Sequence, residues 1–248
     1  MKNKIFNEDC LIGMNRIPDK SIDMILCDLP YGTTRNKWDS ILPLGLLWEQ
    51  YERIIKDNGA IVLTAQTPFD KVLGVSNLKL LKYEWIWEKG NASGHLNAKK
   101  MPMKAHENIL VFYKKLPVYN PIKTTGHKPV NSYVKHTNDG SNYGETKVYR
   151  SGGGSTERYP RSVKYFSSDK QKEPIHPTQK PVALFEYLIK TYTNEGETVL
   201  DNCMGSGTTA IACLNTNRNY IGFELDGEYF EKINQRIKSY HSNTEEEN

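Results

Sequence analysis

The strongest constraint on the fold is a turn with two glycines in the last quarter of the sequence. It lies between residues 197–201, whose apolar side chains predict a buried strand, and residues 208–215, which predict a helix. Gly205 and Gly207 let the backbone turn sharply and let a ligand approach it closely, and the start of the helix then offers free N–H groups. A strand, a glycine turn and a helix in this order predict an α/β fold with a ligand site at the end of the strand.

A carboxylate follows at the end of the next predicted strand. That strand covers residues 219–224, and Glu224 stands 17 residues after Gly207, where it can accept hydrogen bonds from ribose hydroxyls. Position 210 is Ala where the dinucleotide fingerprint has its third glycine, too little chain follows for a second nucleotide-binding half, and no Gly-Lys-Ser/Thr motif is present. The pattern therefore favours a nucleoside ligand without phosphates, and a plain tight turn is the alternative.

The rest of the chain alternates between predicted strands and predicted helices. Further strands are expected at residues 21–28, 60–64, 83–87 and 109–113, and further helices at residues 44–56, 182–192 and 228–240, the first of them ended by Asn58 and Gly59. Residues 115–174 predict an irregular or short-stranded module without long helices. Strand–helix repetition on both sides of this module predicts an α/β fold, a mostly parallel sheet with helices on both faces.

Simple counts exclude several classes of protein. The longest apolar runs are only a few residues, so no membrane span is expected, and the first residues lack the pattern of a signal peptide, so a cytoplasmic location is expected. The four cysteines, at positions 10, 27, 203 and 213, have neither CxxC spacing nor a histidine at zinc-ligand distance. We expect reduced, buried thiols, with no disulfide, no metal site and no cysteine nucleophile.

Charge is distributed unevenly along the chain. Residues 89–175 carry 16 basic and 6 acidic side chains, and the remainder carries 17 basic and 23 acidic ones. The total of +4 therefore hides a segment of net charge +10 and a remainder of −6. Such a segment predicts binding to a polyanion, and a solvated, lysine-rich loop region is the alternative from charge alone.

A second candidate site follows residues 21–28, the other strong strand. Asp28 ends that strand, and the loop continues with Leu29, Pro30 and Tyr31. Ligands of open parallel sheets bind at the carboxyl ends of the strands. There the Asp28 carboxylate and the Leu29 carbonyl can accept the two hydrogens of an exocyclic amine while Tyr31 stacks on the heterocycle that carries it. Taken alone, the tetrapeptide also fits a simple turn.

Four motifs together carry a resemblance to a known family. They are the tetrapeptide Asp28-Leu29-Pro30-Tyr31, the glycine motif Asp201-Asn202-Cys203-Met204-Gly205-Ser206-Gly207-Thr208-Thr209, the segment His176-Pro177-Thr178-Gln179-Lys180-Pro181, and Asn7-Glu8-Asp9-Cys10. Their residues and order resemble those of the exocyclic-amino DNA methyltransferases, in the circularly permuted β group, where the catalytic tetrapeptide precedes the glycine motif. Leu29 replaces a usual Pro of the tetrapeptide, and Asn202-Cys203 replaces the usual Pro-Phe of the cofactor motif.

The resemblance implies a fold, a cofactor and a division of the chain. The fold is a Rossmann-like S-adenosylmethionine-dependent methyltransferase fold in circularly permuted form, and the cofactor is S-adenosylmethionine. Residues 1–114 would form the catalytic half of the core, 115–174 an inserted target-recognition module, 175–241 the cofactor-binding half and 242–248 a flexible tail.

The same resemblance implies the site residues. The catalytic ones are Asp28, Leu29, Pro30 and Tyr31. The cofactor-binding ones are Asp9, Cys10, His176, Thr178, Gln179, Lys180, Asp201, Met204, Gly205, Ser206, Gly207, Thr208, Thr209, Glu224 and Leu225. Within the basic segment, the candidate DNA contacts are Lys99, Lys100, Lys104, Arg150, Arg158 and Arg161.

The implied reaction is direct, in-line transfer of a methyl group to the N6 amine of adenine in DNA. In the family, Asp at the first position of the tetrapeptide is usual for adenine, and Ser is commoner for cytosine. The target base must leave the duplex stack, so base flipping is expected. DNA is the expected partner, and the resemblance also allows a homodimer and a cognate restriction endonuclease. The alternatives are an N4-cytosine DNA methyltransferase, an RNA or protein amine methyltransferase, and a non-catalytic DNA-binding module.

Overall fold

The computed structural model describes residues 1–32, 40–131, 133–135, 139–140, 144–145, 149–151, 153–168 and 179–246. The chain divides into two compact units. The larger unit comprises Met1–Asn120 and Ser162–Asn248, and the smaller one comprises Pro121–Arg161. Among the described residues, no helix is both long enough and apolar enough to cross a membrane.

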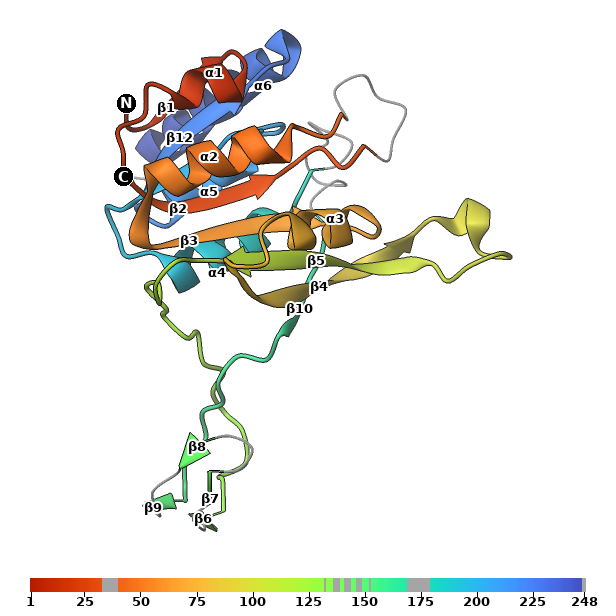
Figure 1. Cartoon of the computed structure of the whole chain (residues 1–248), viewed down its shortest axis with the longest axis vertical. Helices are drawn as coiled ribbons and strands as arrows, with labels where there is room; N and C mark the ends of the chain where they lie inside the picture. Colours follow the sequence, from red (N-terminus) through yellow and green to blue (C-terminus); the bar gives the residue numbers. More distant parts are fainter. Residues whose placement is uncertain are drawn as a thin grey trace. The chain divides into compact units, whose positions relative to one another are not determined.

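The larger unit is built on an eight-stranded sheet (Figure 1). In spatial order its strands are β1 (Lys4–Asn7), β12 (Asn219–Glu224), β11 (Thr198–Asp201), β2 (Ile22–Asp28), β3 (Ile55–Ala65), β5 (Lys104–Phe112), β4 (Leu81–Ser93) and β10 (Val163–Phe166). β5 runs antiparallel to both of its neighbours, and the other neighbouring pairs of this sheet are parallel. The prediction of a mostly parallel α/β sheet is confirmed.

Helices cover both faces of the sheet because the central strands are apolar on both sides. In β2, Ile25 and Cys27 belong to one buried cluster and Met24 and Leu26 to the other, as expected for alternating side chains. The first cluster is completed by α1 (Cys10–Met14), α2 (Leu44–Ile54) and α3 (Phe69–Ser76). The second is completed by α4 (Val182–Tyr192), α5 (Thr208–Asn215) and α6 (Gly227–Glu246).

The two strands that carry the sequence motifs are neighbours at the centre of this sheet. β11 pairs in parallel with β2, with Val199 opposite Met24 and Leu200 opposite Ile25. Asp28 and the glycine turn therefore emerge at the same edge, although they are far apart in the chain. The strands β2 and β3 extend from this junction on one side, and β11 and β12 extend on the other, which makes it a topological switch point.

Several predicted boundaries need correction. α2 ends at Ile54, and Asn58 and Gly59 lie inside β3 instead of capping the helix. A Cβ atom at Gly59 would lie 2.8 Å from the carbonyl oxygen of Asp23, so glycine here permits close approach of β2 and β3. α6 is longer than the predicted helix and continues into the residues expected to be a flexible tail.

β4 and β5 are also longer than the predicted strands at residues 83–87 and 109–113. They form a hairpin that continues past the end of β3 to a tip around the short 3₁₀ helix η1 (His95–Asn97). Figure 1 shows this hairpin projecting from the sheet. The sequence pattern predicted one stretch of each strand and not their extension to the tip.

The smaller unit consists of short strands. β6 (Tyr133–Lys135) pairs antiparallel with β9 (Tyr149–Ser151), and β7 (Asp139–Gly140) pairs antiparallel with β8 (Gly144–Glu145). These short strands agree with the irregular or short-stranded module predicted for residues 115–174. The predicted module of residues 115–174 encloses this unit and also contains β10, which pairs with β4 in the main sheet.

Candidate active site

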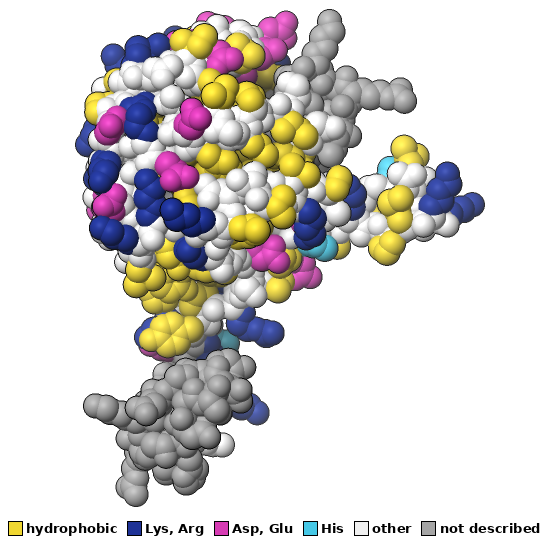
Figure 2. Space-filling view, in the orientation of Figure 1, with side chains coloured by type: hydrophobic (Ala, Val, Ile, Leu, Met, Phe, Trp, Pro, Cys, Tyr) yellow, Lys and Arg dark blue, Asp and Glu magenta, His cyan; other side chains and the backbone are white. Residues whose placement is uncertain are grey.

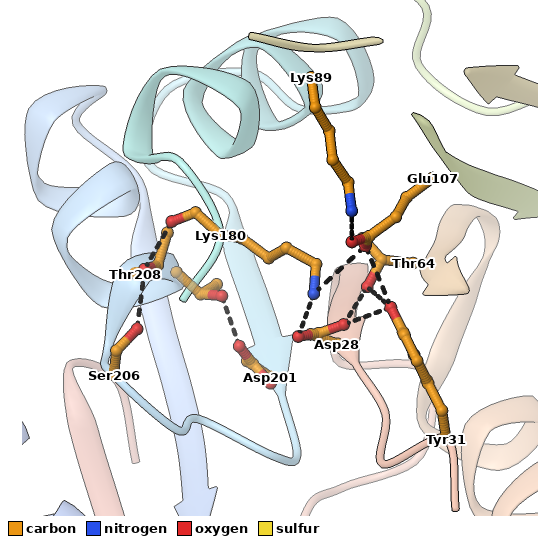
Figure 3. Close-up of polar contacts among 10 residues, drawn as sticks. Asp28, Tyr31, Thr64, Lys89, Glu107, Lys180, Asp201, Ser206 and Thr208 are labelled. Carbon is orange, nitrogen blue, oxygen red and sulfur yellow. Dashed lines mark hydrogen bonds and ion pairs between the residues drawn. The ribbon is translucent and has the colours of Figure 1, made fainter. Parts of the chain in front are cut away.

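The end of β2 carries a cluster of polar side chains (Figure 3). The Tyr31 hydroxyl donates a hydrogen bond to Asp28 Oδ1 at 2.7 Å and lies 3.1 Å from Thr64 Oγ1. Thr64, opposite Asp28 on β3, also donates a short hydrogen bond to Oδ1. The Tyr31 ring stacks on Phe69 with 5.4 Å between ring centroids. Asp28 is thereby fixed at a strand end by two hydroxyl groups and a supported aromatic ring.

A lysine lies against the other oxygen of Asp28. Lys180 Nζ is 2.5 Å from Asp28 Oδ2 and 5.5 Å from the centre of the Tyr31 ring. It is also 3.4 Å from Glu107 Oε2, and only 6% of its side chain is exposed. Lys180 was predicted to bind the cofactor, whereas its ammonium group here contacts the predicted catalytic residues.

Glu107 links this lysine to a second one. Its Oε1 lies 2.6 Å from Lys89 Nζ, and its Oε2 faces Lys180 and lies 3.5 Å from the Tyr31 hydroxyl. Burial by itself raises the pKa of Glu107, but the two ammonium groups outweigh it and hold that pKa below its usual value. Burial likewise lowers the pKa of Lys180, and the attraction of Asp28 and Glu107 outweighs it and raises that pKa. The cluster therefore brings the carboxyl groups of Asp28 and Glu107 together with the amino groups of Lys89 and Lys180.

Sequence reasoning missed Thr64, Lys89 and Glu107. Thr64 could have been found, because it is the last polar residue of a predicted strand next to the strand of Asp28. Glu107 precedes the apolar run of β5, and it reaches this edge because β5 runs antiparallel to its neighbours. The spacing of residues does not encode that reversal, so no local signal identifies Glu107 or its partner Lys89.

The glycine turn after β11 closes on Glu224. The backbone N–H of Gly205 donates to Glu224 Oε2 at 2.7 Å, and that of Asp226 donates to Oε1 at 2.9 Å. Gly205 and Gly207 have φ angles of +54° and +76°, the left-handed region that favours glycine. Burial raises the pKa of the Glu224 carboxyl. The glycine turn predicted from the sequence therefore holds the Glu224 carboxylate at the end of β12.

Hydrogen bonds of Asp201 and of the motif's serine and threonine side chains stabilise the glycine turn. Asp201 accepts a hydrogen bond from the backbone N–H of Cys203 at 3.0 Å and a short one from the Thr209 hydroxyl. Burial raises the pKa of Asp201 to about 6. Ser206 Oγ and Thr208 Oγ1 lie 3.0 Å apart, and Thr208 donates to the backbone carbonyl of Lys180 at 3.2 Å. That last bond joins the glycine motif to the residue that faces Asp28.

The N-terminal motif lies beside the same turn. Asp9 caps α1 by accepting from the backbone N–H of Leu11 at 2.7 Å, and Cys10 is buried. Asn202, one of the departures from the family pattern, donates to Cys10 Sγ at 3.5 Å and accepts from Tyr51 Oη at 2.5 Å. Asn202 therefore connects the N-terminal motif, α2 and the glycine motif.

The remaining predicted residues fall into three groups. Met204 and Gln179 are buried, whereas Leu225, next to Glu224, is 71% exposed. His176 and Thr178 lie outside the described residues, as does the side chain of Arg150 on β9. Of the predicted DNA contacts, Lys99, Lys100 and Lys104 lie on the β4–β5 hairpin, and Arg158 and Arg161 belong to the smaller unit. Arg158 donates to the backbone carbonyls of Ser155, Glu157 and Lys128.

The turn between β11 and α5 fits a nucleoside-type cofactor. A Cβ atom added at Gly205 would meet only Cys203 O at 3.9 Å, so the backbone is open to a ligand there, whereas one at Gly207 would lie 2.7 Å from Ile233. A carboxylate and an exposed apolar side chain, those of Glu224 and Leu225, follow at the next strand end. A permuted α/β sheet with this turn beside the Asp28 cluster defines a Rossmann-like methyltransferase.

Comparison with known proteins gives the family. A family model described as DNA methylase, of the N6/N4 type, matches residues 22–235, so the chain belongs to the N6/N4 DNA methylase family. It is an S-adenosylmethionine-dependent DNA methyltransferase of the exocyclic-amino class.

Relatives and solved structures agree with this. The type II methyltransferase M1.MboII of Moraxella bovis is 28% identical, with 94% of this chain and 95% of that protein covered. The DNA adenine methyltransferase YhdJ of Escherichia coli is 29% identical over 94% of this chain and 82% of that protein. The M1.HpyAVI complex with S-adenosylmethionine matches with a TM-score of 0.65 and 25% identity over 94% and 98% of the two chains. The cytosine-N4-specific PvuII DNA methyltransferase has a TM-score of 0.66 at 15% identity, over 92% and 84%, and shares the fold.

Proposed function

We propose that this methyltransferase acts on the exocyclic N6 amine of adenine in DNA. The observation that carries the proposal is the environment of Asp28, whose carboxylate is held at the strand end by Tyr31 and Thr64 and faces an ammonium group. Asp at the first position of the tetrapeptide is the family's usual choice for adenine. The relative from Escherichia coli, named a DNA adenine methyltransferase, supports the same choice.

Lys180 indicates how an amine would be received. Its ammonium group makes two contacts that the target amine requires, one to Asp28 Oδ2 and one over the Tyr31 ring. In the proposed reaction the adenine amine takes this place and donates to Asp28 and to the Leu29 carbonyl. Two hydrogen bonds of this kind favour a pyramidal nitrogen, whose lone pair is less delocalised into the ring and is therefore a better nucleophile.

As the nitrogen bonds to the methyl group, the electron pair of the broken C–S bond would stay on the sulfur, and Asp28 stabilises the positive charge that develops on the nitrogen. Loss of one N–H proton to water then gives the neutral N6-methyl amine. Tyr31 and Thr64 keep the carboxylate in position, so little reorganisation is needed during the reaction. Glu107 offers Lys180 a second carboxylate, 3.4 Å from its ammonium group, when the amine binds Asp28. This route needs no cysteine nucleophile.

The cofactor would be held at the glycine turn. S-adenosylmethionine, when bound, supplies a methyl group activated on a positively charged sulfur. We assign Glu224 to its ribose hydroxyls and the backbone around Gly205 to the rest of the nucleoside, on the fit described above. Asp201, Ser206, Thr208 and Thr209 stabilise the turn that forms this surface.

DNA would be bound by the basic segment of residues 89–175. Target recognition is assigned to the insert of residues 115–174, and the target base is flipped into the Asp28 site. We also propose a cytoplasmic enzyme, active alone or as a homodimer, with a cognate restriction endonuclease as partner. The last point rests on relatives named type II methyltransferases.

Sequencing of modified bases in DNA from cells expressing the chain tests the proposal. We expect N6-methyladenine at one short sequence context, and none in cells expressing the Asp28→Ala variant. N4-methylcytosine in place of N6-methyladenine in the modified sequence context would contradict the assignment to adenine. DNA without any new modification, from cells in which the folded protein accumulates, would contradict the activity itself.

A further inference from the structure

The hairpin of β4 and β5 is a second feature of the catalytic edge. Lys89 on β4 and Glu107 on β5 belong to the Asp28 cluster, and both strands continue beyond them. Its last strand pair is Ser93 with Lys104. At about 3.3 Å per residue, the four steps from Lys89 to Ser93 carry the hairpin roughly 13 Å past the site before its tip begins.

The tip has a defined backbone. Gly94 has a φ angle of +88°, and the backbone N–H groups of Asn97 and Ala98 donate to the carbonyls of Gly94 and His95 at 2.9 and 3.0 Å. The N–H groups of Lys100 and Met101 both donate to the Asn97 carbonyl. A tip closed by its own hydrogen bonds can present side chains in a fixed arrangement, at a lower entropic cost of binding.

Its side chains combine two properties. Leu96, Met101 and Met103 leave 89%, 53% and 41% of their surface exposed. Residues 94–104 also contain three lysines, Lys99, Lys100 and Lys104, and no acidic residue. Figure 2 shows the projecting hairpin with apolar and basic side chains on one surface. Exposed large apolar side chains on a projecting arm indicate a binding partner, and the lysines indicate that it is anionic.

Duplex DNA has both properties that this tip complements. Its phosphates are anionic, and its base stack is apolar. Apolar side chains that enter a base step partly unstack it, at a free-energy cost that contacts with the DNA offset. An enzyme that acts on an exocyclic amine needs such help, because the target base must first leave the stack.

We propose that the tip of this hairpin, residues 94–103, is a wedge that opens the DNA beside the target base. Leu96, with Met101, enters the base stack, while Lys99 and Lys100 bind the flanking phosphates. The inference rests on the proposed function, because it assigns the wedge to the same edge of the sheet as Asp28. Beyond the proposed function, Leu96 and Met101 would lower the free energy needed to flip the target base out of the duplex.

Two substrates separate this role from simple DNA binding. One is a duplex with the methylation site, and the other is the same duplex with an abasic site opposite the target base, which then has no pairing partner and leaves the stack at a lower cost. For the variant Leu96→Ala/Met101→Ala we expect kcat/KM to fall on the order of tenfold or more on the intact duplex, and to stay within about twofold of the unmodified enzyme on the abasic duplex.

Two control variants complete the experiment. Leu78→Ala removes an equally large side chain that is 64% exposed, just before β4 at the end of that strand opposite the tip, and should leave both rates unchanged. Lys99→Ala/Lys100→Ala should weaken binding to both duplexes by the same factor and reduce their salt dependence. Light scattering and thermal unfolding of each variant show whether its assembly state and fold are kept.

The outcomes are distinct. Equal losses on both duplexes with the Leu96→Ala/Met101→Ala variant would overturn the wedge, and a simultaneous loss of a dimer would assign the tip to self-association instead. Unchanged rates on both duplexes would also overturn it. If the unmodified enzyme methylates neither duplex, the proposed function fails as well, and the two failures are thereby distinguished.

Discussion

Asp28 and Lys180 show how single residues from opposite halves of the chain make one site. Lys180 Nζ lies 2.5 Å from Asp28 Oδ2, and both residues belong to sequence motifs. Asp28, Tyr31, Gly205 and Glu224 could be predicted as site residues because each stands within a short local motif. The contact of Lys180 with Asp28 could not, since it depends on the packing of residues 152 positions apart.

Lys180→Met removes an ammonium group that faces both Asp28 and Glu107. The substitution leaves Asp28 and the buried Glu107 with one cation fewer, so the pKa of Glu107 should rise and the protein should lose about 3–5 kcal/mol of stability. The matched control is Lys190→Met on α4, whose exposed ion pair with Glu186 is worth less than about 1 kcal/mol. Urea unfolding of both variants measures the difference. Equal effects would show that Lys180 is no more important for stability than a surface lysine.

The buried Asp201 carboxyl should make the stability of the protein depend on pH. Burial raises the pKa of Asp201 from 3.8 to about 6, so the folded protein favours the protonated form. Stability from this group is fully present below about pH 4 and is lost as pH rises to about 6, by roughly 3 kcal/mol in all. Asp201→Asn removes the titration, so its stability relative to the unmodified protein should increase between pH 4 and 6 and then level off. Free energies of unfolding of both proteins, measured between pH 4 and 6 and above, test this expectation. A difference between the two proteins that does not change with pH would contradict it.

At the scale of elements, the strongest local patterns were predicted best. The helices at residues 182–192 and 208–215 and the strand at 219–224 form with the predicted bounds. β1, α3 and β10 were missed because they are short or partly exposed and gain their stability from neighbours in the sheet. The hairpin tip was missed because its exposed apolar side chains have no periodic pattern.

The glycine turn leads to a prediction at this scale. Gly207 has a φ angle of +76°, and an added Cβ atom would lie 2.7 Å from buried Ile233. Gly207→Ala should therefore destabilise the protein by about 1–3 kcal/mol and weaken binding of S-adenosylmethionine. Gly45→Ala is the control, because that glycine lies in α2 with nothing within 4 Å of the added atom and should gain up to about 1 kcal/mol. Thermal unfolding and calorimetry measure both effects. A Gly207→Ala variant as stable as Gly45→Ala would contradict the account of the turn.

For the whole molecule, the uneven distribution of charge predicts that the affinity for DNA depends on salt concentration. Residues 89–175 carry a net charge of +10, and the rest of the chain carries −6. If the basic segment binds phosphates, the logarithm of the DNA affinity should fall linearly with the logarithm of salt concentration, with a slope steeper than about −3. Fluorescence anisotropy between low and physiological salt measures the slope. A nearly flat dependence would show that the basic segment is a solvated surface.

We propose that the Asp28 site methylates the N6 amine of adenine in DNA. The most direct measurement incubates the purified chain with unmethylated DNA and S-adenosylmethionine, digests the DNA to nucleosides and identifies them by mass spectrometry. We expect N6-methyladenine with the unmodified chain and none with Asp28→Ala, although that variant should still bind S-adenosylmethionine. N4-methylcytosine as the only product, or the same yield of N6-methyladenine from the Asp28→Ala variant, would contradict it.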